Sequence, residues 1–81
     1  MEPQIDRSDV IKKLKEFHYD RYACDLEMDV TFRDQDYDSL DFVELIMMTE
    51  REYNICIPDQ KLPDVATPND LVSLVCEHLP Q

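Results

Sequence analysis

One serine, Ser39, lies among acids and aliphatic residues in the stretch D38-S39-L40-D41-F42-V43-E44-L45, directly after the acidic run D34-Q35-D36-Y37. Residues of these types support three kinds of chemistry. The hydroxyl can act as a catalytic nucleophile, the spaced acids can form a calcium loop, or the hydroxyl can receive a group that another enzyme delivers. The spacing of the neighbouring residues distinguishes these three interpretations.

The calcium loop fails on its own spacing. If Asp34 is position 1 of an EF-hand loop, the glycine required at position 6 is replaced by Ser39, and the bidentate acid required at position 12 is replaced by Leu45. Glu44 lies one position too early to take that place. A small calcium-binding module is therefore the least favoured alternative, and we predict no metal site.

A catalytic serine needs a base within hydrogen-bonding reach and donors for an oxyanion. The two histidines, His18 and His78, fall near the ends of predicted helices, and no G-x-S-x-G turn can form because the chain contains no glycine. We therefore predict no catalytic residue and a protein that is not an enzyme. In the first turn of a helix, by contrast, free backbone N–H groups and the helix dipole favour an anion. Ser39 is accordingly well placed to carry a phosphodiester that a modifying enzyme makes.

Helical periodicity predicts the elements around this serine. Asp6 or Ser8 can cap a first helix, which turns an apolar face inward and ends near residues 17–22. Residues 20–37 mix acids with scattered apolar side chains, which is too irregular for a long helix and too apolar for disorder. This segment is predicted to be a long loop that packs on the core.

The second predicted helix carries the serine. Asp38 is a good N-cap, and Asp41, three positions later, completes a capping box; both acids are also favoured by the positive end of the helix dipole. The helix is expected to run to about Tyr53, with Ser39 in its first turn.

Prolines delimit the rest of the chain. Between Pro58 and Pro63 there is room for about one turn of helix, because an internal proline loses a hydrogen bond and clashes with the preceding turn. T67-P68-N69-D70 predicts the start of a last helix that ends at Pro80. The predicted fold is all-α, a four-helix bundle with three main helices, one short third helix, and a long loop between helices 1 and 2.

Composition limits the class of function. The 81 residues are expected to form a single domain, residues 1–81, whose core is too small for a large buried active site. The formal charge of −11 repels nucleic acid and anionic membranes. Residues 34–59 contain eight acids and one base, so the negative field is strongest around Ser39. The expected partners are proteins with basic surfaces.

Cysteines and hydropathy bear on the compartment. Cys24, Cys56 and Cys76 are odd in number and far apart, which favours idle thiols in a reducing compartment over a disulfide framework or a zinc site. The chain has no leader-like start, and no apolar run approaches the roughly 18 residues of a membrane span. We expect a complete cytoplasmic protein, monomeric and without membrane insertion.

The segment from Asp38 to Asp59 resembles the phosphopantetheine attachment region of the acyl carrier protein family. The likeness is carried by D38-S39-L40-D41-x-V43-E44-L45-I46-M47, E50-x-E52-Y53 and I57-P58-D59, and T67-P68-N69-D70-L71 resembles the start of the family's last helix.

This resemblance implies a four-helix bundle in which a phosphopantetheinyl transferase attaches 4′-phosphopantetheine from coenzyme A to Ser39. The arm would carry acyl thioesters between acyl-loading and acyl-processing enzymes of fatty-acid, polyketide or related pathways. An aminoacyl or peptidyl carrier, or a carrier-like interaction subunit that is never modified, is the alternative.

The second predicted helix also suggests a docking surface. Its core stripe is expected to comprise Phe42, Leu45, Ile46, Thr49 and Tyr53. Leu40, Val43 and Met47 form a second apolar line beside acids, which is typical of a transient docking surface for basic enzymes, although such a line can also be core in a helix buried on two sides. The predicted partner-binding residues are Asp38, Leu40, Asp41, Val43, Glu44, Met47, Glu50 and Ile57.

Three positions depart from the family pattern. Asp36 stands where glycine is usual, Tyr37 occupies the place of a small residue, and Pro63 falls within the expected third helix. The bulk and charge before the serine are expected to narrow the choice of partner, and Pro63 to shorten the helix beside the entrance for an acyl chain. We therefore predict a specialised discrete carrier.

Overall fold

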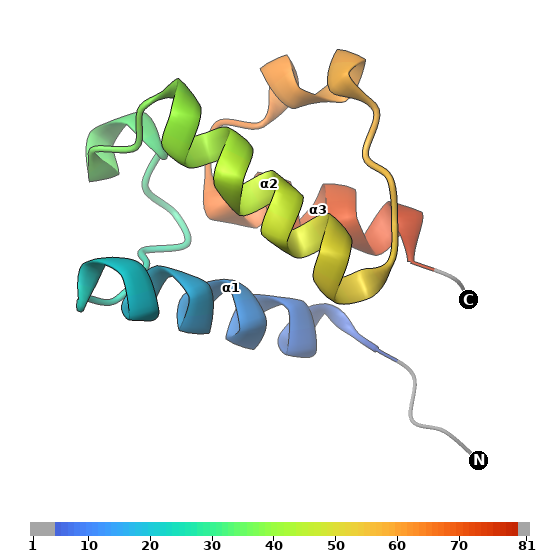
Figure 1. The fold of residues 1–81 in the computed structure, drawn as a ribbon, viewed down its shortest axis with the longest axis horizontal. Helices are drawn as coiled ribbons and strands as arrows, with labels where there is room; N and C mark the ends of the chain where they lie inside the picture. The colour runs from blue at the N-terminus through green and yellow to red at the C-terminus, as the bar shows by residue number, and fades with distance from the viewer. Residues whose placement is uncertain (1–4, 80–81) are drawn as a thin grey trace.

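The computed structural model describes residues 5–79, and every regular element in that range is helical, as predicted. Figure 1 shows α1 along one side of the molecule, α2 running diagonally above it in front of α3, and the short η2 above them. The elements are α1 (Arg7–Tyr22), η1 (Arg33–Gln35), α2 (Ser39–Tyr53), η2 (Asp59–Asp64) and α3 (Pro68–His78). The predicted stop at Pro80 lies outside the described residues.

Each α-helix begins with a capping box. The N-cap side chain accepts a hydrogen bond from the N3 backbone N–H, and the N3 carboxylate accepts one from the N-cap N–H, so two donors at each helix start are satisfied locally. The pairs are Asp6 with Asp9, Asp38 with Asp41, and Thr67 with Asp70. The last two were predicted, and of the two candidate caps for α1 the chain uses Asp6 rather than Ser8.

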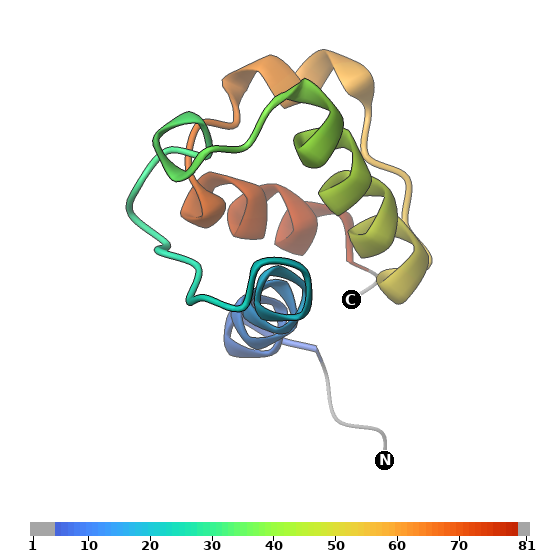
Figure 2. The same cartoon turned by 60° about the vertical axis from the view of Figure 1, so that its left-hand side comes forward.

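The core lies where the three α-helices meet, which Figure 2 shows with α1 viewed nearly along its axis. Helix α1 packs against α3. On α2 the buried residues Leu45, Ile46 and Thr49 lie on the predicted stripe, and Phe42 and Tyr53 are half-buried against the same core. The fully buried side chains from the other two helices include Val10, Leu14, Leu71, Val72 and Val75.

The loop between α1 and α2 is long and pinned to the core, as predicted. Helix α1 extends to Tyr22 and is closed by Ala23 in the left-handed conformation, with its N–H bonded to the carbonyl of Tyr19. Further along, Phe32 is buried and donates its backbone N–H to the carbonyl of Ala66, just before α3. Within α3, the N–H of Asn69 donates to the carbonyl of Met28, so the loop reaches Ser39 along a path held by α3 and by the residue that leads into it.

The segment η2 is longer than the prolines suggested. It is a 3₁₀-helix of six residues that includes Pro63, whereas about one turn was expected. A 3₁₀-helix uses i to i+3 bonds, and here the N–H groups of Lys61 and Val65 donate to Pro58 and Leu62. Pro63 has no backbone N–H and donates no hydrogen bond between those two. The helix nevertheless continues past it to Asp64.

Candidate functional site

Ser39 is the first residue of α2 and is exposed. Asp38 holds the helix start, because its Oδ1 accepts the N–H of Asp41 at 2.8 Å while Asp41 Oδ2 accepts the N–H of Asp38 at 3.3 Å. The hydrogen bond from the Asp38 backbone lowers the pKa of the Asp41 carboxyl. The Asp41 carboxylate therefore stays ionised at neutral pH and can accept the hydrogen bond that closes the capping box at the start of α2.

An open groove of about 670 Å³ adjoins Ser39. Its wall comes from the loop before α2 on one side and from η2 on the other, and Figure 1 shows both segments beside the start of α2. The apolar part of the lining is Phe32, Tyr37, Phe42, Leu62, Pro63, Val65 and Ala66. A flexible, partly apolar group attached to Ser39 would meet this groove directly.

Tyr37 is turned inward. The side chain is only 9% exposed, and its hydroxyl lies 2.8 Å from Nδ1 of the buried His18 on α1. Burial lowers the pKa of His18 and raises that of Tyr37. The Tyr37 ring packs edge-on against Phe32, and Cys24 Sγ lies 3.4 Å from Nε2 of His18. The bulky Tyr37 side chain, which was expected to face partners, therefore belongs to the core and joins α1 to the residue before Asp38.

Asp36 adopts a positive φ of 67° at the end of η1. Glycine enters this left-handed region without steric cost, and aspartate tolerates it better than most residues. This backbone conformation is one that glycine favours, and Asp36 adopts it in this chain. Unlike Tyr37, Asp36 is exposed.

The second apolar line on α2 faces outward. Leu40 is 70% exposed, Val43 45% and Met47 51%, so these side chains are not core in a helix buried on two sides. Ile57 differs, since it is 3% exposed and belongs to the core cluster. Its burial does not support the prediction that Ile57 contacts partners.

Every acid in the predicted partner-binding set also has an internal role. Asp38 and Asp41 form the capping box, and Glu50 accepts the backbone N–H of Ile57 at 2.8 Å, which fastens the chain after α2 to the helix. Glu44 pairs with Arg21 from the last turn of α1.

Arg21 is a site residue that the sequence did not indicate. One of its terminal nitrogens donates to Glu44 and the other lies 3.2 Å from Asp41 Oδ1. The residues around position 21 do not indicate this contact, because Asp41 and Glu44 lie 20 and 23 residues further along the chain. The guanidinium of Arg21 therefore lies against the acidic side of α2 and neutralises part of its charge.

Two other properties bear on the kind of site. Within residues 5–79, no three or more side chains of His, Cys, Asp or Glu are arranged to hold a metal ion. In the same range, no helix combines the length and apolar character needed to cross a membrane.

Comparison with known proteins connects this geometry to a family. The sequence pattern of the phosphopantetheine attachment site family matches residues 21–75. The acyl carrier protein of Rubrobacter xylanophilus is 39% identical over 79 residues, which covers 91% of this chain and 96% of that protein. The acyl carrier protein of Clostridium acetobutylicum is 36% identical over 73 residues, with 85% and 95% covered.

The fold agrees with a solved structure. The crystal structure of an acyl carrier protein from Thermotoga maritima superposes with a TM-score of 0.78 at 25% identity, over 94% of this chain and 93% of that one. Acyl carrier proteins have a covalently attached 4′-phosphopantetheine group and act as carriers rather than as enzymes. The helical bundle, the phosphopantetheine attachment pattern and these relatives together show that the chain belongs to the acyl carrier protein family.

Proposed function

We propose that Ser39 is the attachment residue and that the arm carries acyl thioesters between cytoplasmic enzymes of a fatty-acid, polyketide or related pathway. The observation that carries the proposal is an exposed hydroxyl at the first position of a capped helix, beside an open groove with an apolar lining. The backbone N–H groups of a helix start favour the phosphodiester anion that attachment creates.

The attachment step needs an outside base. The Ser39 oxygen would attack the phosphorus of coenzyme A that bears the pantetheine, a new P–O bond would form, and the bond to the nucleotide phosphate would break. The serine proton would pass to a base of the transferase, and adenosine 3′,5′-bisphosphate would leave. His18 does not supply this base, because it is buried and its Nδ1 lies within hydrogen-bonding distance of the Tyr37 hydroxyl.

The groove supports an acyl cargo. The attached group supplies a thiol that holds the cargo as a thioester, and the groove beside Ser39 offers aromatic and aliphatic side chains to an apolar chain. Phe32 and Phe42 pack edge-on at a centroid distance of 5.3 Å in its wall. An aminoacyl cargo would gain less from such a lining, which is why we favour the acyl carrier.

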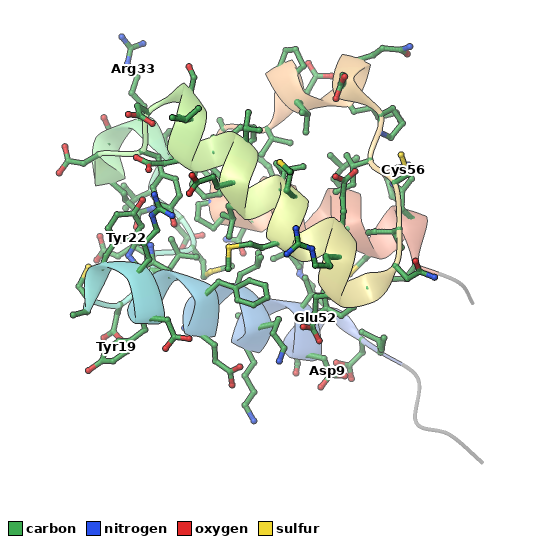
Figure 3. The ribbon with its side chains drawn as sticks, viewed as in Figure 1. Asp9, Tyr19, Tyr22, Arg33, Glu52 and Cys56 are labelled. Carbon is green, nitrogen blue, oxygen red and sulfur yellow. The ribbon has the colours of Figure 1, made fainter. Side chains whose placement is uncertain are left out.

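Leu40, Val43 and Met47 would form the apolar centre of the docking surface for the transferase and for acyl-processing enzymes with basic patches. Exposed apolar side chains in a line beside the modified residue match the composition of a transient interface. Tyr19 offers a matched control, since it is 56% exposed but projects from α1 away from α2, as Figure 3 shows.

Attachment is tested by mass spectrometry of the intact protein after incubation with coenzyme A and a broad-specificity phosphopantetheinyl transferase. One added arm is expected on the wild type and on Ser8→Ala, which removes a serine from the first turn of α1. Ser39→Ala should gain none. Failure of the wild type to gain an arm would leave an unmodified interaction subunit, and an arm on Ser39→Ala would move the site elsewhere.

Docking is tested by the initial rate of the same reaction. Met47→Gln should lower kcat/KM severalfold, because interface side chains contribute on the order of 1 kcal/mol each when they are central. Tyr19→Gln should leave the rate unchanged. Glu44→Lys should also slow modification at low salt, and equal rates for Glu44→Lys and the wild type would contradict electrostatic steering.

A further inference from the structure

We propose that Arg21 determines which partners the docking surface accepts, by occupying the acids of α2 that a basic partner would otherwise contact. This inference rests on the proposed function, since it concerns docking at Ser39. Arg21 spans Asp41 and Glu44 with its two terminal nitrogens, and its side chain is 47% exposed. The guanidinium is therefore part of the surface that a partner meets.

Half of the negative charge at this place is compensated. The two carboxylates and one guanidinium leave a net charge of about −1 where the sequence of α2 alone suggests −2. Both oxygens of Asp41 are engaged, one by Arg21 and the other by the N–H of Asp38. A lysine approaching Glu44 must share it with Arg21 and is repelled by that guanidinium at close range.

Other acids near Ser39 keep their charge available. Asp34 and Asp36 are exposed on the loop before α2, and within residues 5–79 neither forms an ion pair. Arg33 on the same loop is also exposed and offsets one of these charges, so the acids that remain open to a basic partner near Ser39 lie on that loop, with a net charge of about −1, and not beneath Arg21.

The partner that fits is a protein whose apolar patch covers Leu40, Val43 and Met47 and whose basic group reaches the loop before Ser39. Over Arg21 it presents a neutral group or a carboxylate, which the remaining N–H donors of the guanidinium can bond. A partner that relies on a lysine or arginine over Glu44 is disfavoured. Arg21 thus acts as a specificity determinant through an ion pair within the carrier.

The test compares two variants that each remove one positive charge. Arg21→Gln exposes Asp41 and Glu44, whereas Lys15→Gln changes an exposed residue of α1 that forms no ion pair among the described residues. With a phosphopantetheinyl transferase that has a basic docking surface, Arg21→Gln should raise kcat/KM roughly two- to fivefold over Lys15→Gln at low salt. The difference should shrink as sodium chloride screens the charges.

A cycle with Glu44→Gln isolates the ion pair from a general loss of stability. In the wild type this change should lower kcat/KM by a smaller factor than in Arg21→Gln, because Arg21 already shares the carboxylate. In Arg21→Gln it should lower kcat/KM by about the factor that Arg21→Gln gained. Thermal melts confirm that the variants are folded at the assay temperature.

Equal rates for Arg21→Gln and Lys15→Gln, a slower Arg21→Gln, or the same effect of Glu44→Gln in both backgrounds would each overturn the role of Arg21 while leaving the carrier function in place. Absence of modification at Ser39 in the wild type is a different result, because it overturns the proposed function and the docking inference with it.

Discussion

Replacing Tyr37 with phenylalanine removes one hydroxyl from the core and tests how the chain before Ser39 is held. The hydroxyl lies 2.8 Å from Nδ1 of His18, and both side chains are buried. A buried polar atom that loses its partner costs about 1–3 kcal/mol. Tyr37→Ala removes the ring as well, and truncation of a large aromatic in a core costs roughly 3–5 kcal/mol.

These losses are large for a domain of this size. At about 0.05–0.15 kcal/mol per residue, a chain of 81 residues has a free energy of unfolding of about 4–12 kcal/mol. Tyr37→Phe should therefore leave a folded but weaker protein, whereas Tyr37→Ala should be close to unfolding. The family's usual small residue is thus expected to be harmful at this position of this chain.

Urea unfolding followed by circular dichroism measures the change, with Tyr19→Phe as the control because Tyr19 is exposed. The control should lie within about 0.5 kcal/mol of the wild type, as surface substitutions usually do. A Tyr37→Phe variant as stable as Tyr19→Phe would refute the reasoning, since the hydrogen bond to His18 would then contribute nothing to the fold.

Three further changes test neighbouring features by urea unfolding. Burial lowers the pKa of His18 below its usual value of about 6.5, so on acidification the unfolded chain binds the proton before the folded chain does. The free energy of unfolding should therefore fall as the pH drops from about 7 through 6.5 toward the lowered pKa. His18→Gln should flatten this slope, His78→Gln should not, and an unchanged slope in His18→Gln would assign the pH dependence to other groups. Asp36→Gly should be at least as stable as the wild type. Asp36→Ala should be about 1 kcal/mol less stable than Asp36→Gly because of the positive φ of residue 36. Equal stabilities of the two variants would argue against that conformation in solution. Thr67→Ala removes the side-chain acceptor at the start of α3 and should cost about 1 kcal/mol, a loss that Thr67→Ser should restore if the cap is the cause.

Features that depend only on neighbours along the chain could be predicted before the fold was known. Asp38 and Thr67 could be recognised as helix caps because a capping box is complete within four residues. The same local pattern placed Ser39 in the first turn of α2, and the spacing around it indicated the family before the comparisons with known proteins showed it. The all-α class followed from helical periodicity and from the prolines.

Features that join distant segments depend on how the helices pack against one another. The pairing of Arg21 with Glu44 and of His18 with Tyr37 depends on how α1 lies against α2, which no local pattern encodes. Periodicity grouped the exposed line on α2 but did not say whether a neighbour covers it, and Ile57 next to the attachment region proved to be core. Side-chain burial is a property of packing between elements, so these roles became visible only when the helices were in place.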